Sequence, residues 1–174
     1  MKNFWLAARE IIEVVVIALV TVFIIRSFLV QPFLVNGASM EPNFEDGNYL
    51  LVDEISYRFA APRRGEVVVF RYPNDRSVFF IKRLVGLPGE RLVIRDGKIY
   101  IEGKELSEEY LGPTPHTEGK ISVNLGKDEY FVLGDNRSYS FDSRNWGPIQ
   151  REDIIGVARI RVFPFNAMNV FSYE

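Results

Sequence analysis

The chain has 174 residues, enough for one domain with a buried core and a short appendage. Its formal net charge is -2 and it has no long basic run, so nucleic acid is not expected as a partner. Cysteine is absent, which excludes disulfides, a thiolate nucleophile and a cysteine-ligated zinc site. This composition is compatible with either side of a membrane, because an oxidising compartment permits disulfides without requiring them.

An apolar segment lies near the N-terminus, and its uninterrupted run extends from Val14 to Ile25. These 12 residues fall short of the ~20 that span a bilayer, so spanning requires Glu13 or Arg26 to lie near an interface. We expect residues 1–30 to form a short N-terminus and a single transmembrane helix.

Two other interpretations of this segment remain open. A cleavable signal peptide would place small residues after a short apolar core, and NGA before Ser39 weakly resembles such an exit. Glu13 at the start of the core, with Arg26, Gln31 and Pro32 after it, fits a cleavable peptide poorly. A core helix of a soluble domain is the other alternative, although VVVIALVTVFII is apolar on every face.

Basic residues indicate the orientation of the segment. Lys2 and Arg9 precede it, whereas no lysine or arginine occurs in the 31 residues from Ser27 to Tyr57. Positive charge favours the cytoplasmic side of a membrane. We therefore expect a single-pass protein of the cell membrane, with a cytoplasmic N-terminus and an extracytoplasmic domain over residues 31–174.

The remaining chain consists of short runs rich in Val, Ile, Phe and Tyr, separated by Gly, Pro, Asn and Asp. The predicted strands cover 48–57, 66–72, 77–85, 91–103, 129–135 and 154–163. Asp96-Gly97 lies between two alternating runs and predicts a hairpin with a type I′ turn. Residues 104–127 are expected to be an exposed loop or ribbon. The expected fold is mostly β with a lone N-terminal helix.

Histidine occurs once, at His116, inside GPTPHTEG. A Ser-His-Asp triad would have to use it, yet a histidine in a loop rich in proline and glycine is typically solvated and not catalytic. A hydrolytic serine in this chain therefore needs another base. Lysine is the leading candidate, since burial readily lowers the pKa of its ammonium group.

The candidate serine is Ser39, in the stretch VNGASMEPNFEDG. Gly37 and Ala38 before it allow close approach of a substrate backbone, and the serine N–H can help to bind an oxyanion. Taken alone, a serine in such a stretch is most often an ordinary loop residue.

Lys82 lies in VFFIKRLVGLPG, within a predicted strand. Alternation places it on one face with Phe80 and Leu84, and places Arg83 on the opposite face. Both faces are otherwise apolar, so two adjacent cations conflict with burial, and a solvent-exposed strand edge would accommodate only one of them easily. A lysine desolvated by apolar neighbours loses its proton readily and can act as a base.

A third stretch, GDNRSYSFDSRNWG at 134–147, follows a predicted strand. It mixes turn-forming and hydroxyl residues with two aspartates and two arginines. Taken alone, it is typical of a charged loop held by local hydrogen bonds.

Together these stretches resemble the type I signal peptidase family, membrane-bound Ser-Lys proteases that remove signal peptides. GASMEP resembles the nucleophile motif, IKRLVGLPG the base motif and GDNRSYSFDSRNWG the third block, in the family's order after an N-terminal anchor. The resemblance covers nearly the whole chain. It implies a catalytic domain built as an antiparallel β-sheet or barrel, with one N-terminal transmembrane helix.

The resemblance also implies roles for individual residues. Ser39 matches the nucleophile, Lys82 the general base, and Ser140 the hydroxyl that orients the lysine. Other matching positions support the site without performing chemistry: the ion pair of Asp142 and Arg144, together with Asp135 and Arg83. Three residues flank the catalytic positions and are expected to line the substrate groove: Val35, Met40 and Ile81.

The implied activity is endoproteolytic removal of N-terminal signal peptides from exported precursors, through an acyl-enzyme. The family cuts after small residues, usually alanine at the first and third positions before the bond (Ala-X-Ala). The implied partners are signal peptides of exported preproteins and the lipid bilayer, and neither metal nor cofactor is implied. Some members carry a serine two residues before the nucleophile that completes the oxyanion hole. This chain has Gly37 there, so backbone or water is left as the second donor.

Two other functions remain open on the sequence alone. One is a different Ser-Lys hydrolase, such as a self-cleaving regulator, although the anchor and the acidic exterior oppose a role linked to DNA. The other is an anchored, non-catalytic β-domain that binds an exported partner. In such a domain Ser39, Lys82 and Ser140 would be dispensable.

Overall fold

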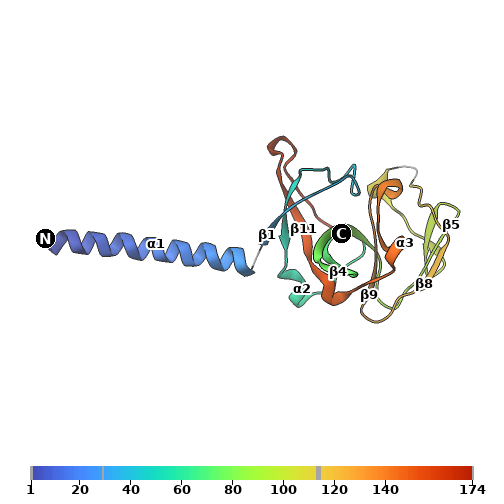
Figure 1. Ribbon diagram of the computed structural model, residues 1–174, viewed down its shortest axis with the longest axis horizontal. Helices are drawn as coiled ribbons and strands as arrows, with labels where there is room; N and C mark the ends of the chain where they lie inside the picture. The colour runs from blue at the N-terminus through green and yellow to red at the C-terminus, as the bar shows by residue number, and fades with distance from the viewer. Residues whose placement is uncertain (1, 29, 113–114, 174) are drawn as a thin grey trace.

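The computed structural model of the chain describes residues 2–28, 30–112 and 115–173. Helix α1 (Lys2–Phe28) extends away from a body built mainly of β-strands (Figure 1). The strands are β1 (Val30–Leu34), β2 (Tyr49–Asp53), β3 (Val67–Tyr72), β4 (Asp75–Gly86), β5 (Arg91–Arg95), β6 (Lys98–Ile101), β7 (Lys104–Glu105), β8 (Ile121–Asn124), β9 (Glu129–Leu133), β10 (Ile149–Gln150), β11 (Ile154–Phe163) and β12 (Asn169–Val170). The short helices are α2 (Ser56–Phe59), α3 (Ser143–Trp146) and the 3₁₀ turns η1 (Glu109–Leu111), η2 (Arg137–Tyr139), η3 (Arg151–Asp153) and η4 (Phe165–Ala167).

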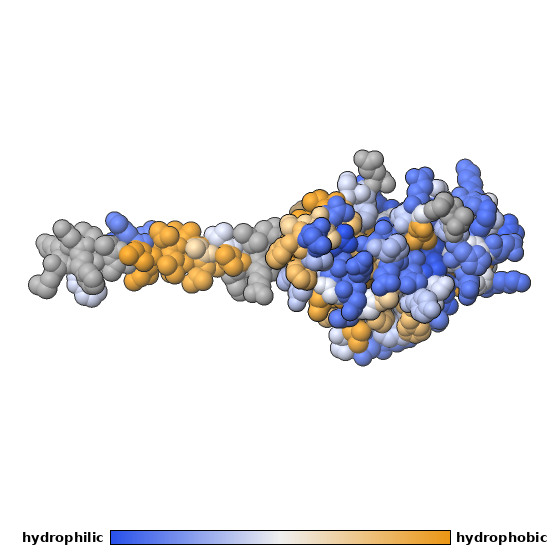
Figure 2. All heavy atoms as spheres, turned by 90° about the horizontal axis from the view of Figure 1, so that it is seen from above, coloured by the Kyte–Doolittle hydropathy of each residue, from blue (hydrophilic) through white to orange (hydrophobic). Residues whose placement is uncertain are grey.

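Helix α1 exposes its side chains on all sides from residue 9 to residue 22. Apolar side chains gather along the middle of the helix (Figure 2). Within the described residues, however, no helix combines the length and apolar character needed to cross a membrane, so the predicted transmembrane helix is not confirmed. The side chains of Lys2 and Arg26, which entered the sequence argument, lie outside the described residues.

The strands form two antiparallel sheets. The larger has the order β1-β2-β11-β3-β4-β9-β10, with β12 paired to β11, and the smaller has the order β7-β6-β5-β8. The smaller sheet lies on the side of the body away from α1 (Figure 1). The expectation of a mostly β, antiparallel fold is confirmed.

Strands β3 and β9 and the second half of β4 are buried on both faces, which explains their nearly continuous apolar sequences. In β3, Val67 and Val68 belong to different hydrophobic clusters. In β4, Leu84 packs in the central cluster, whereas Val85 packs against the smaller sheet. Strand β9 likewise contributes Phe131 to the cluster under the smaller sheet. The two sheets therefore share one continuous body, and β4 runs through its middle.

The predicted strands at 66–72, 77–85 and 154–163 correspond closely to β3, β4 and β11, and 129–135 corresponds to β9. The predicted 91–103 forms the β5–β6 hairpin, with Arg95 paired to Lys98. Asp96 and Gly97 both have positive φ, 53° and 77°, as a type I′ turn requires. This hairpin prediction is confirmed.

The predicted strand at 48–57 ends earlier than expected. Strand β2 stops at Asp53, whose carboxylate accepts the N–H groups of Ile55 and Ser56 at 2.9 and 3.0 Å. These local bonds compete with continued strand pairing, so the chain turns into the short helix α2 instead.

Residues 104–127, expected to be an exposed loop or ribbon, include strands and buried side chains as well as exposed residues. Strands β7 and β8 join the smaller sheet, and Glu108 and Thr117 are 5% and 0% exposed. The buried Arg137 guanidinium bonds to both side chains, and this partner from a distant part of the sequence draws the segment inward. Residues 113–114 of this segment lie outside the described part of the chain.

Gly86 provides a test of packing between the sheets. A Cβ at this position would lie 2.7 Å from Leu125 Cδ1 and 2.9 Å from Phe131 Cβ. We expect Gly86→Ala to lower the free energy of unfolding by about 1–3 kcal/mol, because the core must shift to admit the methyl group. At Gly126 a Cβ would meet only the side chain of Glu129, at 3.2 Å. The matched variant Gly126→Ala should change stability by no more than about 0.5 kcal/mol.

Urea unfolding of the full chain in detergent, followed by circular dichroism, measures both values. Equal stabilities of the two variants would contradict the close packing at Gly86.

Candidate active site

Ser39 lies in the turn that connects β1 to β2, and the third stretch holds this turn in place. The Asn136 backbone N–H donates to the Ser39 carbonyl at 3.1 Å, and its side-chain Nδ2 donates to the Ala38 carbonyl at 3.1 Å. Gly134 allows this close approach, because a Cβ there would overlap the Ser39 carbonyl and the Ser140 side chain. The turn is therefore fixed by contacts between residues about 100 positions apart in sequence.

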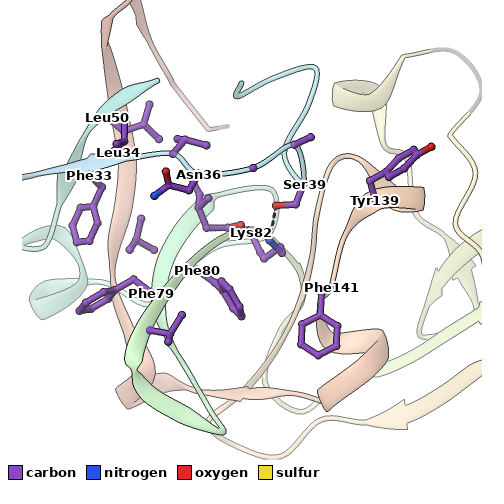
Figure 3. Close-up of a pocket in the computed structure, with 16 residues that line it drawn as sticks. Phe33, Leu34, Asn36, Ser39, Leu50, Phe79, Phe80, Lys82, Tyr139 and Phe141 are labelled. Atoms are coloured by element: carbon purple, nitrogen blue, oxygen red, sulfur yellow. Dashed lines mark hydrogen bonds between the residues drawn. The ribbon is translucent and has the colours of Figure 1, made fainter. Parts of the chain in front are cut away.

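Lys82 lies on β4, and its side chain points toward Ser39 in this turn (Figure 3). Its Nζ donates to Ser39 Oγ at 2.7 Å and to the Ile81 carbonyl at 2.9 Å. Lys82 is only 3% exposed, and its Nζ lies 5.4 Å from the centroid of the Phe80 ring. The structure thus brings the two predicted catalytic residues into direct contact.

The surroundings of Lys82 favour its neutral form. Desolvation by burial lowers the pKa of Lys82 from 10.5 to about 8, whereas the charges of Asp142 and Asp135 act in the opposite direction. Desolvation is therefore the dominant cause, as the sequence argument predicts.

Arg83 points away from the dyad and pairs with Asp135, on the face opposite Lys82 as alternation predicts. Its Nε and Nη2 donate to the two carboxylate oxygens at 2.8 and 2.5 Å, and its Nη1 donates to the Gly65 carbonyl at 2.8 Å. The guanidinium also lies 4.1 Å from the ring centroid of Tyr110. Arg83 and Lys82 are both buried, so neither cation of the IKR sequence reaches solvent at a strand edge.

Asp142 and Arg144 form the predicted ion pair. Arg144 Nε and Nη2 each lie 2.9 Å from an oxygen of Asp142, which is fully buried. Asp142 also caps helix α3 and accepts the Gly134 N–H at 3.1 Å. The pair therefore fixes the loop that packs against the serine turn.

Ser140 lies close to the Ser39 turn without the predicted bond to Lys82. Its Oγ is buried and has no hydrogen-bond partner within the described part of the chain, so a bond to Lys82 is not seen. Its side chain packs against Gly134, close to the Ser39 carbonyl.

A groove of about 470 Å³ runs along one side of the dyad. Val35 and Ile81 line it, as expected, but Met40 does not. Met40 is fully buried beside Phe44 and Leu50, and this correction has a simple cause: the turn after Ser39 directs Met40 into the core.

Sequence reasoning missed most of the aromatic side chains around the groove. Those that line it are Phe33, Phe79, Phe80, Tyr139 and Phe141. Behind it, Trp146 stacks on Phe80 with ring centroids 5.6 Å apart and contacts Phe141 at 4.8 Å. The adjacent phenylalanines before Lys82 were a visible signal, whereas the contribution of the third stretch depends on tertiary structure.

The structure also bears on two other kinds of site, a triad that uses His116 and a metal site. His116 lies against Gly97 in the β5–β6 turn, whereas the side chain that contacts Ser39 Oγ is that of Lys82. Among the residues that the structure describes, no three His, Asp or Glu side chains gather so that they could hold a metal ion.

Comparison with known proteins agrees with this geometry. The model of the family described as signal peptidase, peptidase S26, matches residues 8–163. Signal peptidase I V of Bacillus subtilis (strain 168) is 40% identical over 136 residues, which cover 71% of this chain and 80% of that protein. A probable signal peptidase I-2 of Synechocystis is 38% identical over 170 residues, or 94% and 75% of the two chains.

A crystal structure of a signal peptidase I from Enterococcus faecalis V583 shares the fold. It is 32% identical, has a TM-score of 0.51, and covers 56% of this chain and 97% of its own. The matched family, the relatives and the shared fold agree: this chain belongs to the signal peptidase family, peptidase S26, and is a serine peptidase.

Proposed function

We propose that this chain is a membrane-attached endopeptidase that cleaves N-terminal signal peptides from exported precursors by means of a Ser39–Lys82 dyad. The observation that carries the proposal is the 2.7 Å contact between Ser39 Oγ and a lysine that is 3% exposed. The matched signal peptidases support the substrate class.

In the acylation step, neutral Lys82 accepts the Ser39 hydroxyl proton as Oγ attacks the scissile carbonyl. With the amine neutral, the hydroxyl is the donor in their hydrogen bond. The tetrahedral intermediate then collapses, the C–N bond breaks, and Lys82 returns the proton to the leaving amine. An ester of Ser39 with the signal peptide remains.

In the deacylation step, Lys82 takes a proton from a water molecule that attacks the ester. The C–O bond breaks, and the proton passes to Ser39 Oγ, which regenerates the dyad. The Ser39 backbone N–H is one oxyanion donor. The Gly37 N–H is already donated to Asp46 at 2.6 Å, so the second donor is a different backbone group or water.

The substrate lies extended in the groove, where it adds a strand beside β1 and β4. Val35 and Ile81 contact its side chains near the cut. These apolar walls suit small side chains, in keeping with alanine at the first and third positions before the bond. Ser140 orients Lys82 once substrate binds, and the Asp142–Arg144 and Asp135–Arg83 pairs hold the surrounding loops.

Helix α1 attaches the protein to the membrane in a single pass. Its apolar side chains between residues 11 and 22 are exposed to the surroundings, a costly arrangement in water. The basic residues before them favour a cytoplasmic N-terminus and an extracytoplasmic catalytic domain.

The first test removes the two catalytic groups. Ser39→Ala and Lys82→Ala should each lower kcat/KM for an exported precursor by more than about 10⁴-fold, because the two residues act as one unit. Lys127→Ala, at an exposed lysine outside the groove, should leave cleavage unchanged. Circular dichroism checks that each variant is folded, and wild-type cleavage by folded Ser39→Ala would refute the dyad.

The second test follows activity with pH. Only the neutral amine accepts a proton, so activity is present above the folded-state pKa of Lys82 and is lost as pH falls through it. We expect kcat/KM to rise about tenfold per pH unit and to level off above an apparent pKa of about 8. Lys82→Arg should be inactive, because a guanidinium stays protonated. Activity that still climbs at pH 10 would contradict a buried neutral lysine.

The third test concerns orientation. Protease added to intact spheroplasts should cut the loop around His116, while a tag placed before Trp5 stays intact. Permeabilised cells, in which both are cut, provide the control. Protection of the loop together with loss of the tag would reverse the proposed orientation.

A further inference from the structure

In the larger sheet β1 and β4 are not paired with each other, and the gap between them is here called the seam. The order of this sheet runs from β1 through β2, β11 and β3 to β4, so β1 forms one edge. Strand β4 pairs with β9 only from Arg83 onward, which leaves the preceding residues unpaired on that side. Residues 33–34 of β1 and 78–82 of β4 nevertheless line the same groove. The groove is therefore bounded by two strand edges that have no strand partner within the described residues.

Phe33 on β1 and Phe79 on β4 meet across this seam. Their ring centroids lie 5.9 Å apart with an edge-to-face angle of 66°. The two rings, here called the aromatic pair, lie at one end of the groove, and Tyr139 lies at the other end beyond Ser39 and Lys82 (Figure 3). Phe79 is 44% exposed, so its ring retains apolar surface for a ligand.

The neighbours of the aromatic pair extend this apolar surface. Leu34 is 46% exposed and Val78 is 39% exposed, and both line the groove. The Arg71 guanidinium lies 5.2 Å from the centroid of the Phe79 ring and holds it from the adjacent strand. The end of the groove away from Tyr139 is thus a partly preformed site for a large apolar side chain.

Strand geometry indicates which substrate residue reaches the aromatic pair. Phe79 precedes Lys82 by three residues on a continuous strand, which is about 10 Å at ~3.3 Å per residue. A substrate that extends along β4 from the dyad therefore brings its fourth or fifth residue before the cleaved bond to this level.

We propose that Phe33 and Phe79 bind an apolar side chain four or five residues before the cleaved bond and so favour cleavage of precursors that carry one there. This inference rests on the proposed function. A peptide is a better occupant than a lipid chain, because the groove is continuous with the dyad and its two strand edges offer backbone hydrogen bonds that an acyl chain cannot use.

The experiment compares four internally quenched peptides that share alanine at the first and third positions before the cut. The fourth or the fifth position carries either leucine or serine. The full-length protein cleaves them in detergent at one fixed micelle concentration, and the measured quantity is the ratio of kcat/KM for leucine to that for serine. Partition into micelles affects every enzyme variant equally, so changes in the ratio report on the groove.

For the wild type we expect a ratio of about five to ten at one of the two positions, the size of effect expected for a half-buried apolar contact. Phe79→Ala and Phe33→Ala should each reduce it below about two, and Phe79→Leu should restore part of it. Phe165→Ala removes an aromatic ring that is 77% exposed and outside the groove, so it should leave the wild-type ratio unchanged.

The outcomes separate the inference from the proposed function. A wild-type ratio near one at both positions, or a ratio unaffected by Phe79→Ala, overturns the role of the aromatic pair even though the protein is a peptidase. A ratio that falls equally in Phe165→Ala indicates a general effect of apolar surface on lipid or detergent, and also overturns it. Absence of cleavage of any peptide by the wild type, or cleavage that survives Ser39→Ala, removes the proposed function and the inference with it.

Discussion

The burial of Lys82 against Ser39 is the constraint on which the rest of the site depends. A folded-state pKa of about 8, against 10.5 ordinarily, corresponds to about 3 kcal/mol of lost stability while the lysine is protonated. The loss is complete below pH 8, where both the folded and the unfolded chain hold the proton. It disappears as pH rises from 8 to 10.5, because the folded chain releases its proton first. In the proposed mechanism, this cost at neutral pH keeps the base near its working range.

Without arginine partners, two carboxylates near the lysine would favour its protonated form. Asp142 and Asp135 both raise the pKa of Lys82, which opposes desolvation. Each is buried and paired with an arginine, Arg144 or Arg83, that offsets its charge. The arginine pairs therefore do more than hold loops together. They allow acidic residues to cap α3 and anchor β4 while the site stays suited to a neutral amine.

Much of the fold and part of the site could be predicted from the sequence, because those features depend on local pattern. Apolar runs located β3, β4 and β11, and alternation along β4 placed Lys82 and Arg83 on opposite faces. The short strands β7 and β8 were missed because no local signal marks them, and they form through pairing with the β5–β6 hairpin.

The errors at the site have the same origin. Met40 is adjacent to Ser39 in sequence, yet the turn after Ser39 buries it, and adjacency cannot reveal the direction of a side chain in a turn. Phe33 and Phe79 are 46 positions apart in sequence, and only the curvature of the sheet brings them together. A single sequence carries no record of that curvature.

The seam between β1 and β4 presents the protein with opposing demands. In the proposed function an unpaired strand edge receives the extended substrate, yet the same edge can pair with another copy of the chain. Strand β1 has only five residues and includes Pro32, which lacks an N–H and so removes one donor from the strand. The opposite edge is the half of β4 whose exposed side chains lead into the groove. A short, proline-interrupted edge still leaves bonds for one peptide strand that is also held by its side chains, but it gives little support to the long, regular pairing that drives aggregation.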